Sequence, residues 1–124
     1  MGKAGLKMRA RFSSFGEIEI DKARYQHDVV IERGVVHKRK KKASKPYRTQ
    51  YGHTPLSAGE PIPWVGKKLY IGTGMYGSLP IMPEVYKEAE QRGVEVVVDK
   101  TETICRLLEE LRSKDINAVL HVTC

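Results

Sequence analysis

A glycine-rich loop between an apolar strand and a helix constrains the fold of this chain more than any other feature. A strand-like segment over residues 67–71, Lys-Lys-Leu-Tyr-Ile, ends in the loop Gly72-Thr-Gly-Met-Tyr-Gly77. A helical pattern follows, and a second apolar run over residues 94–98 ends at Asp99. Strand, glycine turn, helix and returning strand together predict a βαβ unit with a parallel pair of strands.

The same loop spells the dinucleotide fingerprint G-x-G-x-x-G through Gly72, Gly74 and Gly77. A dinucleotide site needs a helix that opens inside the fingerprint and points its N-terminus at the pyrophosphate. Proline is tolerated only in the first turn of a helix, so Pro80 and Pro83 predict that this helix begins near Pro83, past the loop. The sequence therefore disfavours a nicotinamide or flavin site. We expect no cofactor and favour a structural or anion-receiving turn.

The N-terminal third reads as an antiparallel meander. Residues 16–20 alternate polar and apolar side chains, a turn follows, and residues 25–31 alternate again before Gly34 permits a third strand. Together with the parallel strands, this predicts an α/β fold. We expect a single three-layer domain over residues 1–124, in which one mixed sheet holds the antiparallel meander and a parallel βαβαβ half, with helices packed on it.

Two helices are predicted within the parallel half. Gly93 is placed to end the first helix in a left-handed conformation. Asp99 or Thr101 is expected to cap the second helix, Asp99 together with Glu102 as a capping box. The apolar stripes of the two helices and the last strand, residues 116–122, supply the core. The helix stripes comprise Met82, Val85, Tyr86 and Ala89, then Ile104, Leu107, Leu108 and Leu111.

Size and cysteine content point to a small cytoplasmic protein. The chain has 124 residues, with no apolar run as long as a signal or membrane segment, and residues 1–11 are expected to be mobile. Cys105 and Cys124 suggest neither a disulfide framework nor a metal-binding pair, and Cys105 is expected to be buried and inert.

The net charge of +7 comes from one basic loop, residues 38–48. Without its seven basic residues the chain holds 15 basic and 15 acidic side chains. A solvated loop is the favoured interpretation, and weak, sequence-independent contact with nucleic acid is the alternative. The candidate contacts are Lys38, Arg39, Lys40, Lys41, Lys42, Lys45 and Arg48.

Residues 43–66 hold four of the six prolines and the single tryptophan but no persistent period. One helical turn could start at Thr54. Structureless stretches of this length tend to be functional, and Tyr47, Tyr51 and Trp64 are the side chains expected to anchor a partner there.

Several segments, taken in order and with their spacing, resemble the small "Mth nine-three-eight-like" domain over roughly residues 12–122. The family includes an adipogenesis-associated cytoplasmic protein and a mitochondrial complex I assembly factor. The resemblance implies a three-layer fold around a mixed sheet, no established reaction, and assembly or regulatory roles. It rests on Phe15-Gly-Glu-Ile-Glu-Ile20, Tyr25-Gln-His-Asp-Val-Val-Ile31, Ile71-Gly-Thr-Gly74, Leu79-Pro80, Gly93-Val-Glu-Val96, Thr101 and Cys105-Arg106.

Two departures separate this chain from the family pattern. Leu107, Leu108 and Glu109 stand where many members carry Thr-Tyr-Asn, which removes polar groups that would line a site. The basic run Lys38-Arg-Lys-Lys-Lys42 replaces the tryptophans of many members, so the chain looks more like an archaeal branch.

The carboxyl ends of the parallel strands are where a ligand is expected in an open α/β sheet. Backbone N–H groups of the glycine turn, two threonine hydroxyls and an arginine could hold an anion there. The alternative, slightly favoured, is that Thr101 caps its helix and the glycines allow a close turn. The candidate ligand residues are Gly72, Thr73, Gly74, Gly77, Thr101 and Arg106.

No catalytic or metal site is recognisable from spacing, so an enzyme is disfavoured. His27 is expected to be a hydrogen-bonded core imidazole, and His37, His53 and His121 lie far apart in the sequence. The favoured function is a non-catalytic protein-binding, assembly or regulatory module. The alternatives are a small anionic ligand or an unknown reaction at the Gly72–Gly77 loop, and weak nucleic-acid binding by the basic loop. The sequence does not set the oligomeric state.

Overall fold

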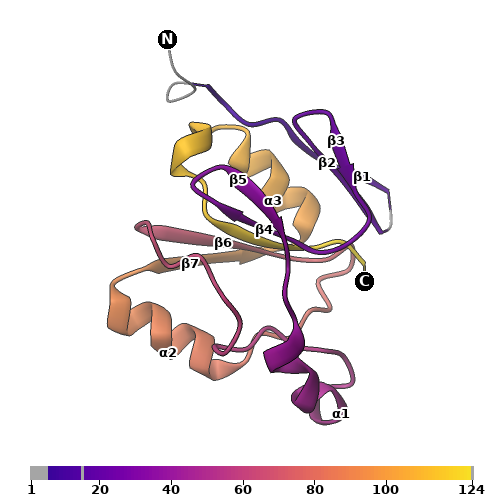
Figure 1. Cartoon of the computed structure of the whole chain (residues 1–124), viewed down its shortest axis with the longest axis vertical. Coiled ribbons are helices and arrows are strands. Elements are labelled where there is room, and N and C mark those ends of the chain that lie inside the picture. Colours follow the sequence, from indigo (N-terminus) through magenta and orange to yellow (C-terminus); the bar gives the residue numbers. More distant parts are fainter. Residues whose placement is uncertain (1–5, 15, 124) are drawn as a thin grey trace.

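A five-stranded mixed sheet forms the middle layer of the molecule (Figure 1). The computed structural model describes residues 6–14 and 16–123. The strand order is β5 (Val35–Lys38), β4 (Val29–Glu32), β8 (Ala118–His121), β6 (Lys68–Thr73) and β7 (Glu95–Asp99). The predicted α/β class is confirmed.

The predicted parallel half is confirmed, because β6 pairs in parallel with both β7 and β8. Helix α2 (Pro83–Arg92) joins β6 to β7, and α3 (Thr101–Leu108) joins β7 to β8. The two crossovers run in opposite directions along the sheet, so connections of one hand place the helices on opposite faces. Helix α2 begins at Pro83 and ends at Gly93 in the left-handed region (φ +68°), as predicted.

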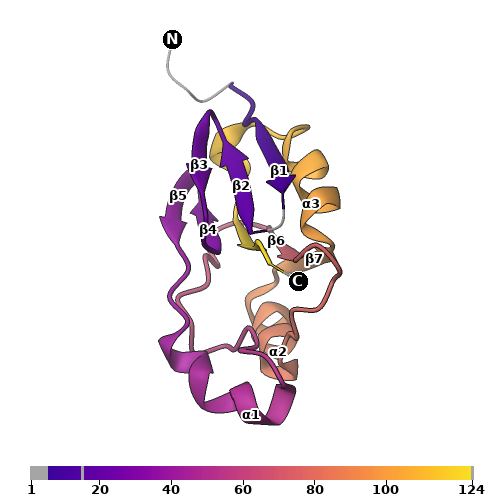
Figure 2. The same cartoon turned by 90° about the vertical axis from the view of Figure 1, so that its right-hand side faces the viewer.

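A second, three-stranded antiparallel sheet lies on the α3 side of the large one (Figure 2). It comprises β1 (Ala10–Ser14), β2 (Glu17–Ile20) and β3 (Ala23–Tyr25). Of the predicted meander, β4 and β5 join the mixed sheet, as expected, and only its first part lies in a separate sheet. The expected strand over residues 25–31 divides between the two sheets. Stacking of the sheets buries Ile20 and Ile31 in one shared core, whereas a single sheet would leave these side chains exposed on one face.

The N-terminal segment packs against the rest of the molecule where the structure describes it. Met8 is buried and Ala10 pairs with Ile20 at the start of β1, a strand that the sequence did not predict. Met8 and Ala10 thus belong to the packed part of the fold, and the mobility expected for residues 1–11 stays a prediction; residues 1–5 lie outside the described part.

Each face of the large sheet carries its own core. On one face, α3 and the small sheet bury Ile104, Leu108 and Ile18 with Ala118 and Leu120. On the other, α2 contributes Val85 and Ala89, which pack with Leu69, Ile71 and Val119 of the sheet. Tyr86 and Leu107, expected in the helix stripes, are largely exposed. Three layers result, as predicted.

The cap predicted for α3 is wrong. Lys100 occupies the N-cap position without a side-chain cap bond, and Thr101 is the first helical residue. Asp99 Oδ1 instead accepts the N–H of Lys100 at 2.7 Å. The Thr101 hydroxyl is consequently free to bond elsewhere.

Short helices occupy the segment that the sequence left without structure. A 3₁₀ helix, η2 (Lys42–Tyr47), leads into α1 (Arg48–Tyr51), and η3 (Ser113–Asp115) precedes β8. The turn predicted at Thr54 is absent, since Leu56 forms a parallel bridge with Ile81. Within residues 6–14 and 16–123, no helix has the length and apolarity needed to cross a membrane.

Candidate functional site

The crevice between β6 and β7, where the sequence placed a ligand, is closed by the protein itself. The Thr73 hydroxyl donates to the Asp99 carbonyl at 3.1 Å across the two strand ends. Gly72 lies flush against Thr101, so that a Cβ at Gly72 would come within 2.8 Å of Thr101 Oγ1 and 2.9 Å of its Cα. The predicted anion site is therefore closed at Gly72 and Thr73, whereas Gly77, farther along the loop, is exposed.

The remaining members of that predicted site do not converge on a ligand. Thr101 Oγ1 accepts the Gly74 N–H at 2.8 Å and donates to the His121 carbonyl at 2.6 Å. Arg106 is exposed and bonds Glu102 one helical turn away, at 2.5 Å. The predicted close approach of the backbone at the glycines is confirmed at Gly72. The Thr101 side chain closes the turn, but it does not cap its helix, so that part of the alternative is wrong.

Arg39, predicted as a nucleic-acid contact, is only 3% exposed. Its Nη1 donates to Asp28 Oδ2 at 2.8 Å, and its Nε and Nη2 donate to the two Glu60 oxygens at 2.8 and 2.7 Å. Nη2 also donates to the Pro55 carbonyl at 2.9 Å. Its assignment to a phosphate contact is wrong, whereas the other six basic residues of the segment are exposed: Lys38, Lys40, Lys41, Lys42, Lys45 and Arg48.

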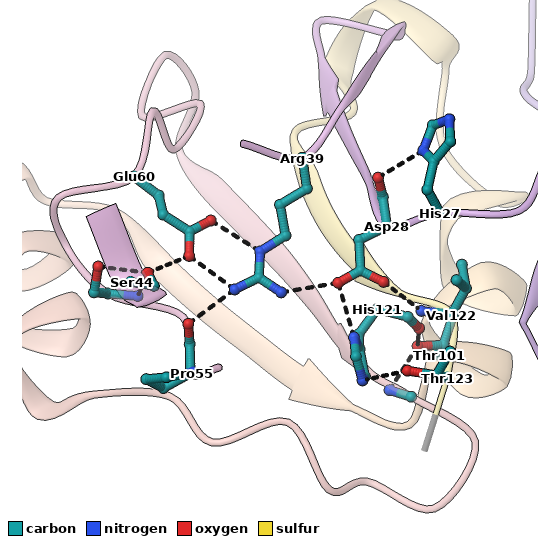
Figure 3. Close-up of polar contacts among 12 residues, drawn as sticks. His27, Asp28, Arg39, Ser44, Pro55, Glu60, Thr101, His121, Val122 and Thr123 are labelled. Atoms are coloured by element: carbon teal, nitrogen blue, oxygen red, sulfur yellow. Dashed lines mark hydrogen bonds and ion pairs between the residues drawn. The ribbon is translucent and has the colours of Figure 1, made fainter. Parts of the chain in front are cut away.

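Asp28 is the centre of a buried polar cluster (Figure 3). Besides Arg39, it accepts the Val122 N–H at 2.9 Å and lies 2.8 Å from His121 Nδ1. Burial opposes the charge of Asp28, but the bonds from His121, Val122 and Arg39 outweigh it and lower its pKa to about 2. Burial likewise opposes the charge of Arg39, yet Glu60 and Asp28 raise its pKa above the usual value.

Glu60 completes the cluster on the other side of Arg39. It accepts two guanidinium bonds and a third from the Ser44 hydroxyl, which also bonds Ser57 Oγ at 2.6 Å. Two carboxylates thus share one guanidinium, so these three side chains carry one net negative charge. The cluster ties β4 and β8 to η2 and the segment that follows it.

A basic cleft of about 310 Å³ lies beside this cluster. It is formed where the chain just after β8, the glycine loop that follows β6 and the segment from Arg39 to Thr54 come together. None of the described residues that line it is acidic. Within residues 6–14 and 16–123, Lys41 and Arg48 form no ion pair. The lining residues are Arg39, Lys41, Arg48, His53, Thr54, Ser78, Leu79, His121 and Thr123.

His121 links the buried cluster to the basic cleft. Its Nδ1 faces Asp28, its Nε2 lies 3.0 Å from the Thr123 hydroxyl, and its side chain is 16% exposed (Figure 3). Spacing gave no signal for this arrangement, because Asp28 and His121 come together only when β8 pairs with β4. His27 bonds the Asp28 carbonyl at 3.0 Å, but it is only partly buried.

No group of three or more His, Cys, Asp or Glu side chains in the described ranges is arranged to hold a metal ion. Cys105 is buried, as predicted. Burial raises the pKa of its thiol to about 12, and nearby Glu109 and Glu102 add to the effect. A thiol held protonated in this way is a poor nucleophile.

The three aromatic side chains expected to anchor a partner are not all buried. Tyr47 is 39% exposed, and Tyr51 and Trp64 are half-buried. Arg92 of α2 lies over the Trp64 ring, 5.7 Å from its centroid. Tyr47 and Tyr51 lie four residues apart, one in η2 and the other in α1.

Solved structures place the chain in a family. A conserved hypothetical protein, PH1505 from Pyrococcus horikoshii OT3, is 32% identical over 96% of this chain and 100% of its own, with a TM-score of 0.72. A protein designated MT938 is 21% identical over 95% and 100% of the two chains, with a TM-score of 0.70. A Bordetella pertussis protein described as a Mth938-like domain is 18% identical over 91% and 85%, with a TM-score of 0.56.

No protein-family profile matches the chain, and no curated protein matches it either. The identity to PH1505 extends over nearly the whole of both chains, and MT938 and the Bordetella pertussis domain share the fold. The chain belongs to the Mth938-like domain family.

Proposed function

We propose that this protein binds a small anionic ligand, a phosphate ester or a carboxylate, in the basic cleft. One observation carries the proposal: cationic, imidazole and hydroxyl groups line the cleft without an acidic side chain among them. The charge of Arg39 is offset by Asp28 and Glu60, so Lys41 and Arg48 are the cations available to a ligand. The anion site that the sequence placed at the glycine loop is therefore replaced, in this proposal, by a site at the end of the neighbouring strand β8.

The shape of the cleft supports a small ligand. Its volume of about 310 Å³ is at the lower end of the range for small-molecule sites. Thr54, Ser78 and Thr123 offer hydroxyl groups that can donate to ligand oxygens. Lys41 and Arg48 supply the charge.

Thermal unfolding with added anions tests the proposal. Ligand that binds only the folded state stabilises it by about 2.7 kcal/mol at a concentration 100-fold above Kd, which is several degrees in Tm. We expect inorganic phosphate, pyrophosphate or citrate to raise Tm at constant ionic strength. The double variant Lys41→Gln/Arg48→Gln should lose most of the shift.

A matched control removes two charges from the same basic segment but away from the cleft. Lys42 and Lys45 are exposed and do not line it. Lys42→Gln/Lys45→Gln should keep the full Tm shift. An equal loss in both double variants would mean that the anions respond to overall charge, and no shift in the wild type would reject the site.

Protein binding is a second candidate, favoured by the exposure of Tyr47 and by its position one turn from half-buried Tyr51. Tyrosine side chains are enriched among the anchors of protein interfaces. Cross-linking pull-downs with the wild type and with Tyr47→Ala test it. A partner whose capture does not depend on Tyr47 would count against this surface.

A further inference from the structure

His121 is hydrogen-bonded through both ring nitrogens to groups of different kinds (Figure 3). Asp28 Oδ2 lies 2.8 Å from Nδ1, and the Asp28 carboxylate is ionised at neutral pH because its pKa is about 2. An ionised carboxylate can only accept, so Nδ1 carries the proton in the neutral ring. Nε2 is then the acceptor, and the Thr123 hydroxyl donates to it at 3.0 Å.

Three further hydrogen bonds fix the backbone of this arrangement. The His121 carbonyl accepts from Thr101 Oγ1 at 2.6 Å, and the Val122 N–H donates to Asp28 at 2.9 Å. The Thr123 carbonyl accepts the Met75 N–H at 2.8 Å. The backbone that carries the His121 and Thr123 side chains is therefore fixed before any ligand enters.

The charges around His121 suit a ring that takes up a proton during a reaction. Asp28 and Glu60 share the single charge of Arg39, which leaves one net negative charge behind the ring. On the cleft side, the ring shares its surroundings with Lys41, Arg48 and His53. Lys41 and Arg48 face an anionic substrate, and the buried negative charge supports a transient imidazolium.

We propose that Thr123, His121 and Asp28 hydrolyse esters of small anionic compounds, with Thr123 as nucleophile, His121 as general base and Asp28 as the group that positions the ring. This activity rests on the proposed anion binding, which brings the ester to the cleft. Carboxylate, imidazole and hydroxyl in this order constitute the arrangement that activates an alcohol for acyl transfer.

The reaction proceeds in two balanced steps. Thr123 Oγ1 bonds to the ester carbonyl carbon while its proton moves to His121 Nε2; the bond to the leaving oxygen then breaks, and that oxygen takes the proton. In the second step, water attacks the acyl carbon and gives a proton to Nε2. The Thr123–acyl bond breaks, and Oγ1 recovers the proton. The net change is ester plus water to acid plus alcohol.

Hydrolysis of mono-4-nitrophenyl succinate, an anionic ester, tests the proposal, with neutral 4-nitrophenyl acetate beside it. We expect kcat/KM to be higher for the anionic ester and to fall at least ~100-fold in Thr123→Val. Thr123→Ser should keep activity within about tenfold of the wild type, because it retains the nucleophile. Thr103→Val is the matched control on a partly exposed helix residue and should leave the rate unchanged.

His121→Gln and His37→Gln provide a second matched pair, since His37 is exposed on β5. His121→Gln should lose at least ~100-fold and should lack the pH dependence of kcat/KM that a general base gives the wild type. His37→Gln should change neither. Mass spectrometry of the wild type after acid quench should find one acyl group on the peptide that holds Thr123.

The outcomes separate this inference from the anion-binding proposal. If phosphate raises Tm through Lys41 and Arg48 but Thr123→Val hydrolyses both esters as fast as the wild type, the hydrolase is overturned and the binding site stands. Acylation at another residue overturns it as well. If no anion binds at all, yet hydrolysis depends on Thr123 and His121, the binding proposal fails and the nucleophile stands.

Discussion

The side chains of Asp28 and His121, 93 residues apart in the chain, meet with Oδ2 and Nδ1 separated by 2.8 Å. Strand pairing brings them together, because Val29 of β4 lies opposite Leu120 of β8. The same aspartate holds Arg39 and the Val122 N–H. The buried Asp28 carboxylate thus connects the packing of the sheet to the His121 ring. Among the described residues, His121 is the one imidazole that both contacts this carboxylate and lines the basic cleft.

The depressed pKa of Asp28 predicts a stability that depends on pH. Its carboxyl has a pKa of about 2 in the folded protein against 3.8 for the ordinary group, so the unfolded chain takes up a proton first as pH falls. The contribution is fully present above about pH 4 and is lost toward pH 2. It amounts to about 2 kcal/mol. Urea unfolding at pH 7, 4 and 2.5 measures it.

The control for this prediction is Asp28→Asn, which cannot ionise. The variant should be less stable at pH 7 by about 3 kcal/mol, because Arg39 loses one of its two carboxylates. It should also lose about 1.4 kcal/mol less than the wild type between pH 4 and 2.5, because part of the Asp28 contribution is lost only below pH 2.5. The same acid loss in both proteins would assign the pH dependence to other carboxyl groups.

Arg39 is predicted to act in stability rather than in contact with nucleic acid. Replacement by Met leaves Asp28 and Glu60 buried without their cation, which costs about 3–5 kcal/mol. Lys40→Met, at the exposed neighbouring position, should cost less than about 0.5 kcal/mol. Chemical denaturation of both variants measures the difference, and equal stabilities would contradict the buried network.

Gly72 is predicted to tolerate no side chain. Its Cβ would meet both the hydroxyl and the Cα of Thr101, so Gly72→Ala must push α3 away from β6 and strain the Thr101–His121 bond. We expect a loss of about 3 kcal/mol. Gly52→Ala is the control: Gly52 has φ +78° but nothing within 4 Å of a Cβ, so only left-handed strain of about 1–2 kcal/mol applies. A milder effect at Gly72 than at Gly52 would refute the close approach.

Cys105 should be unreactive in the folded protein, because burial raises the pKa of its thiol to about 12. In a Cys124→Ser background, which leaves Cys105 as the only thiol, a disulfide reagent at pH 8 should label it only after denaturant is added. Rapid labelling of the native protein would show that α3 opens or that the thiolate is stabilised.

The parallel half of the fold could be predicted because its signals are local. The start of α2 at Pro83 and its end at Gly93 follow from restrictions on single backbone positions. The division of the meander into two sheets could not be predicted, since residues 25–31 alternate in the same way whether the strand continues or crosses between layers. Only the shared core of the stacked sheets decides it.

The site was harder to predict than the fold. A charge run gives no sign that Arg39 turns inward while Lys41 faces the cleft, because the two partners of Arg39 lie at Asp28 and Glu60, in other segments. The sequence gives no signal for His121, because no metal-ligand or catalytic spacing surrounds it. Its partners, Asp28 and Thr101, come from distant parts of the chain and are brought to it by the sheet and by α3.

An amide NMR titration with inorganic phosphate, at constant ionic strength and pH 7, tests the basic cleft most directly. The account predicts saturable shifts that concentrate at Lys41, Arg48, His53, Ser78 and Thr123, with little change at Lys42 and Lys45. Shifts spread over the exposed lysines of the whole chain, or concentrated elsewhere, would contradict it.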